Sequence, residues 1–367
     1  MHLKNIWFNH TFSSEYNIIL ELKKELQKNH KDVKLIGTSK DINAIYSHIC
    51  DEFYQESSDI DEEGYIDYAL NFCKEHNIGV IFPTRYRLAF AHNYEKFEKL
   101  GVVVLVNTDA NLLELLEDKE SCMTSVREGG ICSVSPFESA ETIKEFEEKY
   151  KILKAAKSPF DNCRICMKYN KDEGAVSFRT IQESIPSIDS LRGTIGTKIT
   201  YADICSILGR AEKFNKILLM PYLEGIDVSI DSFRGKDSFF AVTRYKLGNR
   251  RVLIDINKTF YDLSKLFSDY FNLTGLYNLQ LRGHRGKWYF MEINTRMAGG
   301  IHKTVHAGVN IPYLAYKDAI GMSLKEDEGV FRQQFGRQVH LTQVETPVLL
   351  TLDTLLEKDI ENIGNIL

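Results

Sequence analysis

The chain has 367 residues, of which 43% are hydrophobic and 26% charged, a composition typical of globular proteins and too apolar for a disordered chain. It carries 46 Lys and Arg against 51 Asp and Glu, so the formal net charge of −5 provides no strong positive field that would favour nucleic acid or an anionic membrane. No apolar run approaches the roughly 20 residues that span a bilayer, and residues 1–10 lack the long apolar core of a signal peptide. We therefore expect a cytoplasmic protein, and the length predicts about two or three domains.

The first hundred residues alternate short apolar runs with amphipathic stretches. Strands are predicted at 5–8, 32–36, 78–82 and 102–106, and helices at 14–28, 65–76 and 88–100. This alternation predicts βαβ units around a parallel sheet. No glycine occurs in the six residues after the first predicted strand, and the chain contains no GxxxxGK[ST] motif. We therefore expect a Rossmann-like sheet that does not hold a nucleotide through a glycine-rich turn.

From about residue 108 the pattern changes to antiparallel α+β. Helices are predicted at 109–116, 118–127, 142–150, 201–214 and 258–271. Strands are predicted at 164–169, 176–181, 216–223, 227–233, 239–246 and 251–256, followed by a hairpin of 275–282 and 287–294. The Ser-, Gly- and Thr-rich residues 183–199 are interpreted as a mobile loop.

The seven cysteines give no disulfide or metal pattern. Their number is odd, and Cys163 and Cys166 form the only close pair. A zinc site needs a second pair or nearby histidines, and neither follows at a suitable spacing. We interpret the cysteines as reduced thiols.

Polar side chains are concentrated in the predicted hairpin. Gln280 lies on its first strand, and Glu292 and Asn294 share a face on its second because side chains alternate along a strand. The hairpin would bring together one carboxylate and two amide oxygens, which are ligands that Mg²⁺ favours. Arg296 follows, where it would meet phosphates, and Gly299-Gly300 allows backbone to approach a ligand. The alternative is a polar, solvated sheet face, and on either reading we expect Glu292 to face solvent.

Lys168 stands inside an apolar strand and precedes a polar turn. A lysine in this position either extends along the apolar surface to water or pairs with an anion. A phosphate clamp and an ordinary surface hairpin both fit this pattern.

Together these segments resemble the ATP-grasp superfamily, nearest to the carbamoyl-phosphate synthetase-like carboxylate–amine ligases. Residues 275–282 and 287–300, with their E-I-N-x-R-x-x-G-G ending, are similar to the metal-site hairpin of that family. The resemblance covers roughly residues 108–321. It implies a Rossmann-like pre-ATP-grasp domain over 1–107, an ATP-grasp core of two α+β subdomains over 108–322 with its lid at roughly 150–222, and a small C-terminal segment over 323–367.

The resemblance also assigns site residues. Glu292 and Asn294, assisted by Gln280, would hold Mg²⁺ or Mn²⁺, while Arg296 and Lys168 would be the catalytic residues that contact the transferring phosphate. The residues implied to bind ATP are Lys119, Lys168, Gly174, Met220, Tyr222, Leu223, Asp227 and Arg296. The chain departs from the family pattern because Gly174 is the single glycine of the lid turn, Tyr169 replaces a proline and Pro221 replaces an acidic residue.

The implied activity is ATP-dependent ligation. A small-molecule carboxylate would be activated as an acyl phosphate, an amine would attack it, and ADP and phosphate would be released. Two alternatives remain open, namely a catalytically degenerate nucleotide-binding module with a regulatory or partner-binding role, and an ATP-grasp carboxylase or formyl transferase. A homodimer is the commonest oligomeric state for such a protein.

Two further groups of side chains are candidates for substrate contacts. His302 and His306 lie four residues apart, so they would share one face of an α-helix. That spacing also suits a metal, but no third ligand is evident; we favour a substrate-pocket role, and the alternative is that they are structural or solvated histidines. Arg244, Arg282 and Arg285 are each candidates for binding a substrate carboxylate in a bidentate way.

Overall fold

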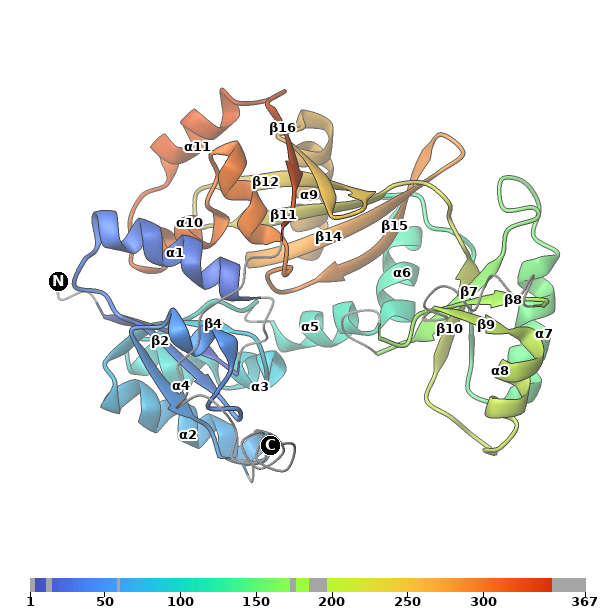
Figure 1. The fold of residues 1–367 in the computed structure, drawn as a ribbon, viewed down its shortest axis with the longest axis horizontal. Coiled ribbons are helices and arrows are strands. Elements are labelled where there is room, and N and C mark those ends of the chain that lie inside the picture. The colour runs from blue at the N-terminus through green and yellow to red at the C-terminus, as the bar shows by residue number, and fades with distance from the viewer. Residues whose placement is uncertain are drawn as a thin grey trace, which may run out of the picture. The chain divides into compact units, whose positions relative to one another are not determined.

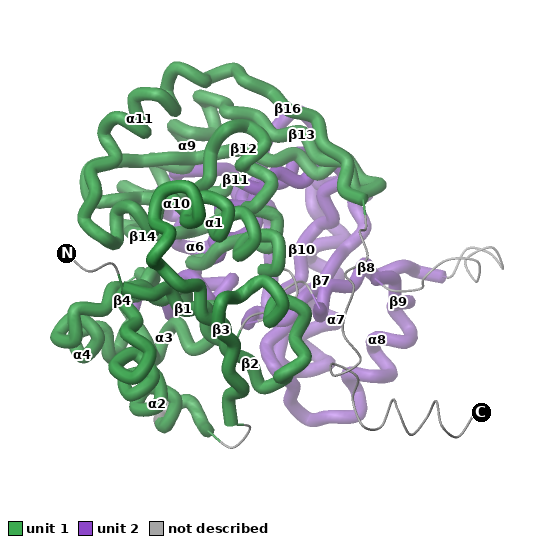
Figure 2. The backbone as a smooth tube through the Cα atoms, turned by 60° about the vertical axis from the view of Figure 1, so that its left-hand side comes forward, with its two compact units in different colours: residues 1–110, 230–278, 295–367 green, residues 111–229, 279–294 purple. Residues whose placement is uncertain are grey.

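The computed structural model describes residues 4–10, 15–57, 60–107, 109–171, 176–184 and 197–344. Their packing divides the chain into two units (Figure 2). Unit 1 consists of residues 1–110, 230–278 and 295–367, and unit 2 of residues 111–229 and 279–294. Neither unit is a continuous stretch of chain. The domain boundaries after residues 107 and 322 follow the family resemblance and stay a prediction.

The N-terminal part of unit 1 is the predicted parallel sheet. Its strands have the order β3-β2-β1-β4-β5 and all four pairings are parallel. The strands are β1 (Asn5–Asn9), β2 (Leu35–Ser39), β3 (Glu52–Gln55), β4 (Ile78–Pro83) and β5 (Val103–Val104). The helices are α1 (Tyr16–Asn29), α2 (Glu62–Glu75), α3 (Arg87–His92) and α4 (Tyr94–Lys99), with the short 3₁₀ helix η2 (Ile45–His48). In Figure 1, α1 covers one face of this sheet and α2 and α4 cover the other.

Two local features differ from the sequence prediction. The edge strand β3 was not predicted, because its Glu-Phe-Tyr-Gln sequence has no apolar run and its side chains are only partly buried or exposed. The single helix predicted over 88–100 is two helices, divided at Asn93, whose φ of −110° is not helical. The Asn93 side chain donates to the Ala89 carbonyl at 2.9 Å, so it ends α3 in the way that asparagine commonly caps a helix.

The remainder of unit 1 is mainly antiparallel. Its strands have the order β14-β11-β12-β13-β16, and β14 and β11 continue along the chain into unit 2. These strands are β11 (Asp227–Arg234), β12 (Phe239–Gly248), β13 (Arg251–Asp255), β14 (Gly275–His284) and β16 (Gln338–Thr342). The helices are α9 (Lys258–Phe271), the 3₁₀ helix η4 (Ile301–Ala307), α10 (Ile311–Ala319) and α11 (Lys325–Arg332). The predicted helix over 258–271 is confirmed.

Unit 2 contains a second sheet of order β6-β10-β7-β8-β9 and the strand β15 (Lys287–Asn294), which pairs with β14. The sheet strands are β6 (Glu138–Ala140), β7 (Ile165–Tyr169), β8 (Arg179–Gln182), β9 (Lys198–Thr200) and β10 (Ile217–Pro221). Its helices are α5 (Ala110–Glu117), α6 (Lys119–Glu128), α7 (Ile143–Lys154) and α8 (Tyr201–Leu208). Helices α7 and α8 pack on the sheet through a core that includes Phe146, Leu153 and Ile217.

This second sheet is mixed, because β8 and β9 are parallel while the other pairs are antiparallel. Strand β9 uses residues of the predicted loop over 183–199, whose residues 185–196 lie outside the described part of the chain. Among the described residues, no helix combines the length and apolar character that crossing a membrane requires.

Candidate active site

The hairpin of β14 and β15 turns through two residues in the left-handed region, Arg285 at φ 44° and Gly286 at φ 80°. Two such residues match the right-handed twist of the flanking strands, which is why short hairpins use them. The turn directs β15 back, and helix α6 packs against that strand within unit 2. Glu292 and Asn294 stand at the end of β15, where the Asn294 Nδ2 donates to the Glu292 Oε1 at 3.1 Å.

Lys168 lies against the same carboxylate. Its strand β7 is held in register by β10, where Leu218 stands opposite Lys168. The Lys168 Nζ donates to the Glu292 Oε2 at 3.2 Å, and the two side chains are 11% and 24% exposed. Glu292 is therefore less solvated than the sequence suggested, and its second oxygen forms an ion pair inside unit 2.

Lys119, the first residue of α6, is also buried near this carboxylate. Its Nζ donates to the Asn170 carbonyl at 3.2 Å, and the residue is 8% exposed. Asp118 caps the helix by accepting from the Ser121 amide at 2.9 Å, and its other oxygen accepts from the Asn170 Nδ2 at 2.7 Å. Asn170 therefore fixes the start of α6 beside the end of β7. The sequence pattern did not point to Asn170, although its place two positions after Lys168 was a usable signal.

The two lysines determine the charge state of Glu292. Burial alone would raise the pKa of this carboxyl, but the charge of Lys168, the Asn294 hydrogen bond and the charge of Lys119 lower the pKa to about 2. The carboxylate is therefore ionised at neutral pH although most of it is buried. An ionised carboxylate with two cations nearby suits a site that receives a metal ion together with the negative charges of a phosphate chain.

The donor set fits a hard cation such as Mg²⁺, because it consists of carboxylate and amide oxygens. In the described residues no cluster of three or more His, Cys, Asp or Glu side chains could hold a metal, so the amides would have to contribute. Gln280 lies half-buried on β14, next to β15 in the hairpin, and its place among the ligands stays a prediction. A cation at Glu292 would compete with Lys168 and Asn294 for the carboxylate oxygens.

Three of the residues that the family resemblance assigns to ATP binding lie at the end of β10 or just after it, namely Met220, Tyr222 and Leu223. Met220 and Leu223 are each 2% exposed, and the Met220 carbonyl accepts from the Cys166 Sγ at 3.4 Å. The Tyr222 amide donates to the Arg164 carbonyl at 2.7 Å. The backbone of Met220 and Tyr222 is therefore engaged within the protein, and their role in binding adenine stays a prediction.

Two arginines hold the Tyr222 ring, an arrangement that the sequence did not indicate. The Arg164 and Arg282 guanidinium carbons lie 4.9 Å and 4.7 Å from the ring centroid. Arg282 also donates to the Tyr222 hydroxyl at 3.0 Å and lies 3.4 Å from an Asp227 carboxylate oxygen. Arg282, a candidate from sequence for binding a substrate carboxylate, joins Tyr222 to Asp227, two of the residues that the family resemblance assigns to ATP binding.

The other two candidate arginines are also paired with carboxylates of the protein. Arg285 donates to an Asp161 carboxylate oxygen at 2.6 Å. In unit 1, Arg244 is 4% exposed and Asp231 is fully buried. Arg244 donates two hydrogen bonds to the Asp231 carboxylate, and the bond from Nη2 to Oδ1 measures 3.0 Å. Asn278 donates to the same Asp231 oxygen at 2.8 Å, so this pair is part of the core of unit 1.

Unit 1 contains the residues that follow the hairpin. The Arg296 Nη1 donates to the Met297 carbonyl at 3.1 Å. A side chain at Gly300 would collide with Arg244, because a Cβ there would lie 2.4 Å from the Arg244 Nη1. The second glycine of the motif is therefore required by packing in unit 1.

His302 and His306 do not share a face. Their segment η4 is a 3₁₀ helix, in which residues three apart align and residues four apart diverge. His302 is partly buried and its Nδ1 lies 3.0 Å from the Gly299 carbonyl, whereas His306 is exposed. Burial, with the charge of Lys303 and smaller contributions, lowers the pKa of His302 to about 4. The expectation of a shared face was wrong.

Gly174 lies outside the described residues, so its predicted contact with ATP is untested. All seven cysteines are unpaired. Burial raises the pKa of the Cys166 thiol to about 12, so this cysteine is a neutral core residue at physiological pH.

The chain is similar to known proteins in part of its sequence and in its fold. Residues 213–345 match the model of a family described as ATP-grasp in the biosynthetic pathway with the Ter operon. A search of curated protein sequences finds no match.

Solved structures with the same fold are distant in sequence. The L-amino acid ligase from Bacillus licheniformis has a TM-score of 0.62 at 11% identity, covering 93% of this chain and 79% of its own. The N5-carboxyaminoimidazole synthetase from Staphylococcus aureus complexed with ADP has a TM-score of 0.61 at 15% identity, covering 88% and 78%. The biotin carboxylase domain of 2-oxoglutarate carboxylase from Hydrogenobacter thermophilus, in complex with MgADP, ADP and bicarbonate, has a TM-score of 0.59 at 15% identity, covering 88% and 70%.

These matches confirm the predicted fold class of a Rossmann-like domain followed by an ATP-grasp core. Residues 213–345 thus match an ATP-grasp family model, and the chain shares the fold of these solved structures.

Proposed function

We propose that this protein is an ADP-forming carboxylate–amine ligase of the cytoplasm. It would use ATP to convert a small-molecule carboxylate to an acyl phosphate, which an amine then attacks to form an amide. The observation that carries this proposal is the Lys168–Glu292–Asn294 group, in which a mostly buried carboxylate is kept ionised by two lysines and an amide. Acyl-phosphate chemistry depends mainly on positioning and on neutralising charge, and this group supplies both.

Each residue has a role in the proposal. Glu292 and Asn294 would hold Mg²⁺ or Mn²⁺ with help from Gln280, and the cation, when bound, would neutralise phosphate charge. Lys168 would move from Glu292 to the phosphates of ATP once the carboxylate has another cation. Lys119 and Arg296 would contact the phosphate chain as further cations. The linker at Met220, Tyr222 and Leu223 would bind adenine, with Asp227 at the ribose and Gly174 over the phosphates.

Nucleotide binding is tested by thermal unfolding. Mg–ATP at about 100 times its dissociation constant should stabilise the protein by about 2.7 kcal/mol. An unchanged melting midpoint at millimolar Mg–ATP contradicts the proposal at its first step. A raised midpoint without turnover on any substrate favours the degenerate nucleotide-binding alternative.

Turnover is tested by measuring ADP release against a panel of carboxylates and amines, beginning with amino acids and dipeptides. Release that requires both a carboxylate and an amine supports the ligase, and formation of AMP and pyrophosphate contradicts it. Gel filtration of the same preparation tests the expected homodimer.

Carboxylation is the second candidate, because two of the similar structures are described as an N5-carboxyaminoimidazole synthetase and a biotin carboxylase domain. Bicarbonate therefore belongs in the panel as a carboxylate. ADP release that requires bicarbonate and an amine, and that no other carboxylate supports, would favour this candidate.

A further inference from the structure

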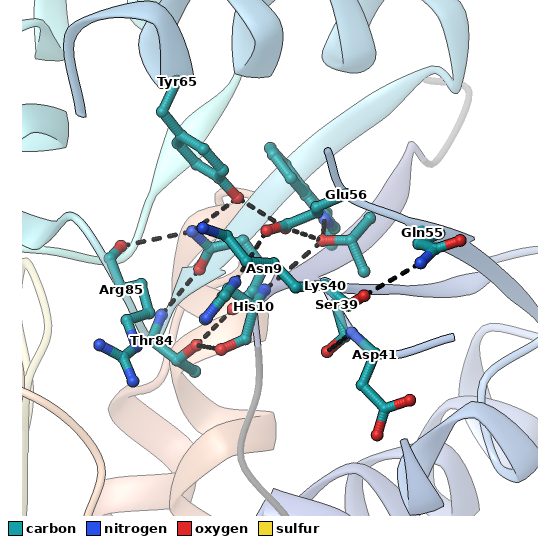
Figure 3. A network of polar contacts seen from close by, with 12 residues as sticks. Asn9, His10, Ser39, Lys40, Asp41, Gln55, Glu56, Tyr65, Thr84 and Arg85 are labelled. Atoms are coloured by element: carbon teal, nitrogen blue, oxygen red, sulfur yellow. Dashed lines mark hydrogen bonds and ion pairs between the residues drawn. The ribbon is translucent and has the colours of Figure 1, made fainter. Parts of the chain in front are cut away.

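A second polar centre lies at the carboxyl edge of the parallel sheet in unit 1. The strand order β3-β2-β1-β4-β5 reverses between β1 and β4, since the chain leads from β1 outward through β2 and β3 and returns beside β1 as β4. In open parallel sheets, ligands bind outside the carboxyl ends of the strands at such a reversal. Here β1 ends at Asn9, which His10 follows, and Thr84 follows the last residue of β4 (Figure 3).

The centre is built around Glu56, which follows β3 and is 3% exposed. One carboxylate oxygen accepts from the Thr38 hydroxyl at 2.5 Å and from the Tyr65 hydroxyl at 2.7 Å. The other lies 2.9 Å from the His10 Nδ1. Burial would raise the pKa of Glu56, but these hydrogen bonds together lower it. All the bonds of this carboxylate therefore favour its ionised form.

An ionised carboxylate fixes the tautomer of its histidine partner. Because Glu56 can only accept, the hydrogen between the two side chains lies on the His10 Nδ1. The Nε2 of a neutral His10 then carries a lone pair, and the imidazole side chain remains 18% exposed while the Glu56 side chain is 1% exposed. The buried Glu56 carboxylate therefore orients the His10 ring, and the ring offers its Nε2 as a hydrogen-bond acceptor.

The backbone around this acceptor is held in an uncommon conformation. His10 has φ 42° and Tyr86 has φ 57°, both in the left-handed region that non-glycine residues seldom adopt. Their rings lie 6.5 Å apart. The Thr84 hydroxyl donates to the Asn9 carbonyl, and the Asn9 Oδ1 accepts from the Thr84 amide at 2.8 Å, so these bonds join the end of β1 to the residue after β4. Such conformations persist where the surroundings enforce them, and they cluster at ligand sites.

We propose that His10 Nε2 binds the amino group of the amine co-substrate by accepting one of its N–H hydrogens, and that Glu56 is the residue that positions His10. This inference rests on the proposed ligase function and adds a subsite that the ATP-grasp motif does not contain. Lysine and arginine side chains can only donate hydrogen bonds, whereas a neutral histidine with its Nδ1 proton fixed is an acceptor. An amine is the co-substrate that brings a matching donor.

His10→Asn tests the contact atom. The asparagine amide retains a donor toward Glu56, tolerates the left-handed φ and has no atom in the place of Nε2. Loss of one hydrogen bond should raise KM for the amine about tenfold. The matched control is His48→Gln, at an exposed histidine of the same unit, which should leave this KM unchanged.

Glu56→Gln tests the positioning role. The carbonyl oxygen of the introduced glutamine can still accept from Thr38 and Tyr65, but its amide must donate to the His10 Nδ1, which transfers the ring proton to Nε2 and removes the acceptor. The variant should raise KM for the amine as much as His10→Asn does. Nitrogen-15 NMR of histidine-labelled protein should show the His10 proton on Nδ1 in the wild type and on Nε2 in the variant, with His10→Asn identifying the signal.

Trapping the acyl phosphate with hydroxylamine separates this inference from the proposed function. Hydroxamate formed from carboxylate and ATP by the wild type, together with a raised amine KM in both variants, supports the subsite. Hydroxamate formation with an amine KM within twofold of wild type in a folded His10→Asn protein overturns the subsite and leaves the ligase function standing. No hydroxamate and no ADP release with any carboxylate overturns the ligase function and, with it, the subsite.

Discussion

Replacing Glu292 by glutamine should affect both the stability and the metal binding of this protein. The substitution keeps the shape of the side chain and removes its negative charge. Two lysines are buried near this carboxylate: the Lys168 side chain is 11% exposed and Lys119 is 8% exposed. Both would then lack the carboxylate that their charges now stabilise. A buried cation that loses its partner destabilises the folded state.

The magnitude follows from the pKa of the carboxyl. A fall from 4.5 to about 2 on folding favours the ionised folded protein. At about 1.4 kcal/mol for each tenfold change in proton affinity, this corresponds to roughly 3 kcal/mol at neutral pH. That value is an upper bound, because 24% of the side chain is exposed and the glutamine oxygen still accepts hydrogen bonds. The contribution is complete above the unfolded pKa of 4.5 and is lost as the pH falls through the folded value of about 2.

Urea unfolding at pH 7 measures this loss in Glu292→Gln. The double variant Lys168→Met, Glu292→Gln should recover part of the lost stability, because it also removes the unpaired cation. Glu148→Gln, at an exposed position of α7 in the same unit, is the matched control and should change stability by less than about 0.5 kcal/mol.

The same preparations test the metal site. Mg–ATP should stabilise the wild type and the Glu148→Gln control but not Glu292→Gln, because an amide is a weaker ligand for Mg²⁺ than a carboxylate. Turnover should fall by orders of magnitude. A Glu292→Gln protein with wild-type stability and undiminished stabilisation by Mg–ATP would refute the ion pair and the metal site together.

Three further outcomes are expected. Chelating divalent metals with EDTA should abolish the stabilisation of the wild type by ATP, measured by thermal unfolding with and without restored Mg²⁺. Tyr222→Leu should weaken ATP binding about tenfold in calorimetry while the protein stays folded, because the ring that Arg164 and Arg282 flank would be lost. An unchanged affinity for ATP would contradict the assignment of Tyr222 to the nucleotide site. Arg244→Met should destabilise unit 1 by about 3–5 kcal/mol in urea unfolding, because Asp231 would be left buried and charged, and a cost below about 1 kcal/mol would contradict that pairing.

The sequence by itself determined the parts of this protein that local pattern controls. Buried parallel strands are nearly continuous apolar runs, so β1 and β4 were predictable, and α9 was predictable from its helical periodicity. The hairpin motif indicated the ATP-grasp fold that the similar solved structures share, because its polar side chains recur at fixed spacing along two strands. The edge strand β3 and the division of the helix at Asn93 were missed because neither has an apolar signature.

Only the tertiary structure decided which side chains meet. Lys168 and Glu292 are 124 residues apart in the chain, and their contact depends on the packing of β7, β10, α6 and the hairpin in unit 2. No spacing rule predicts that Glu292 would be mostly buried, that Arg282 would hold Tyr222, or that η4 would be a 3₁₀ helix that separates His302 from His306. The Glu56–His10 pair joins the residues that follow β3 and β1, two strands that are not neighbours in the sheet. Burial and partners set the charge and tautomer of these groups, and both are properties of the packed chain.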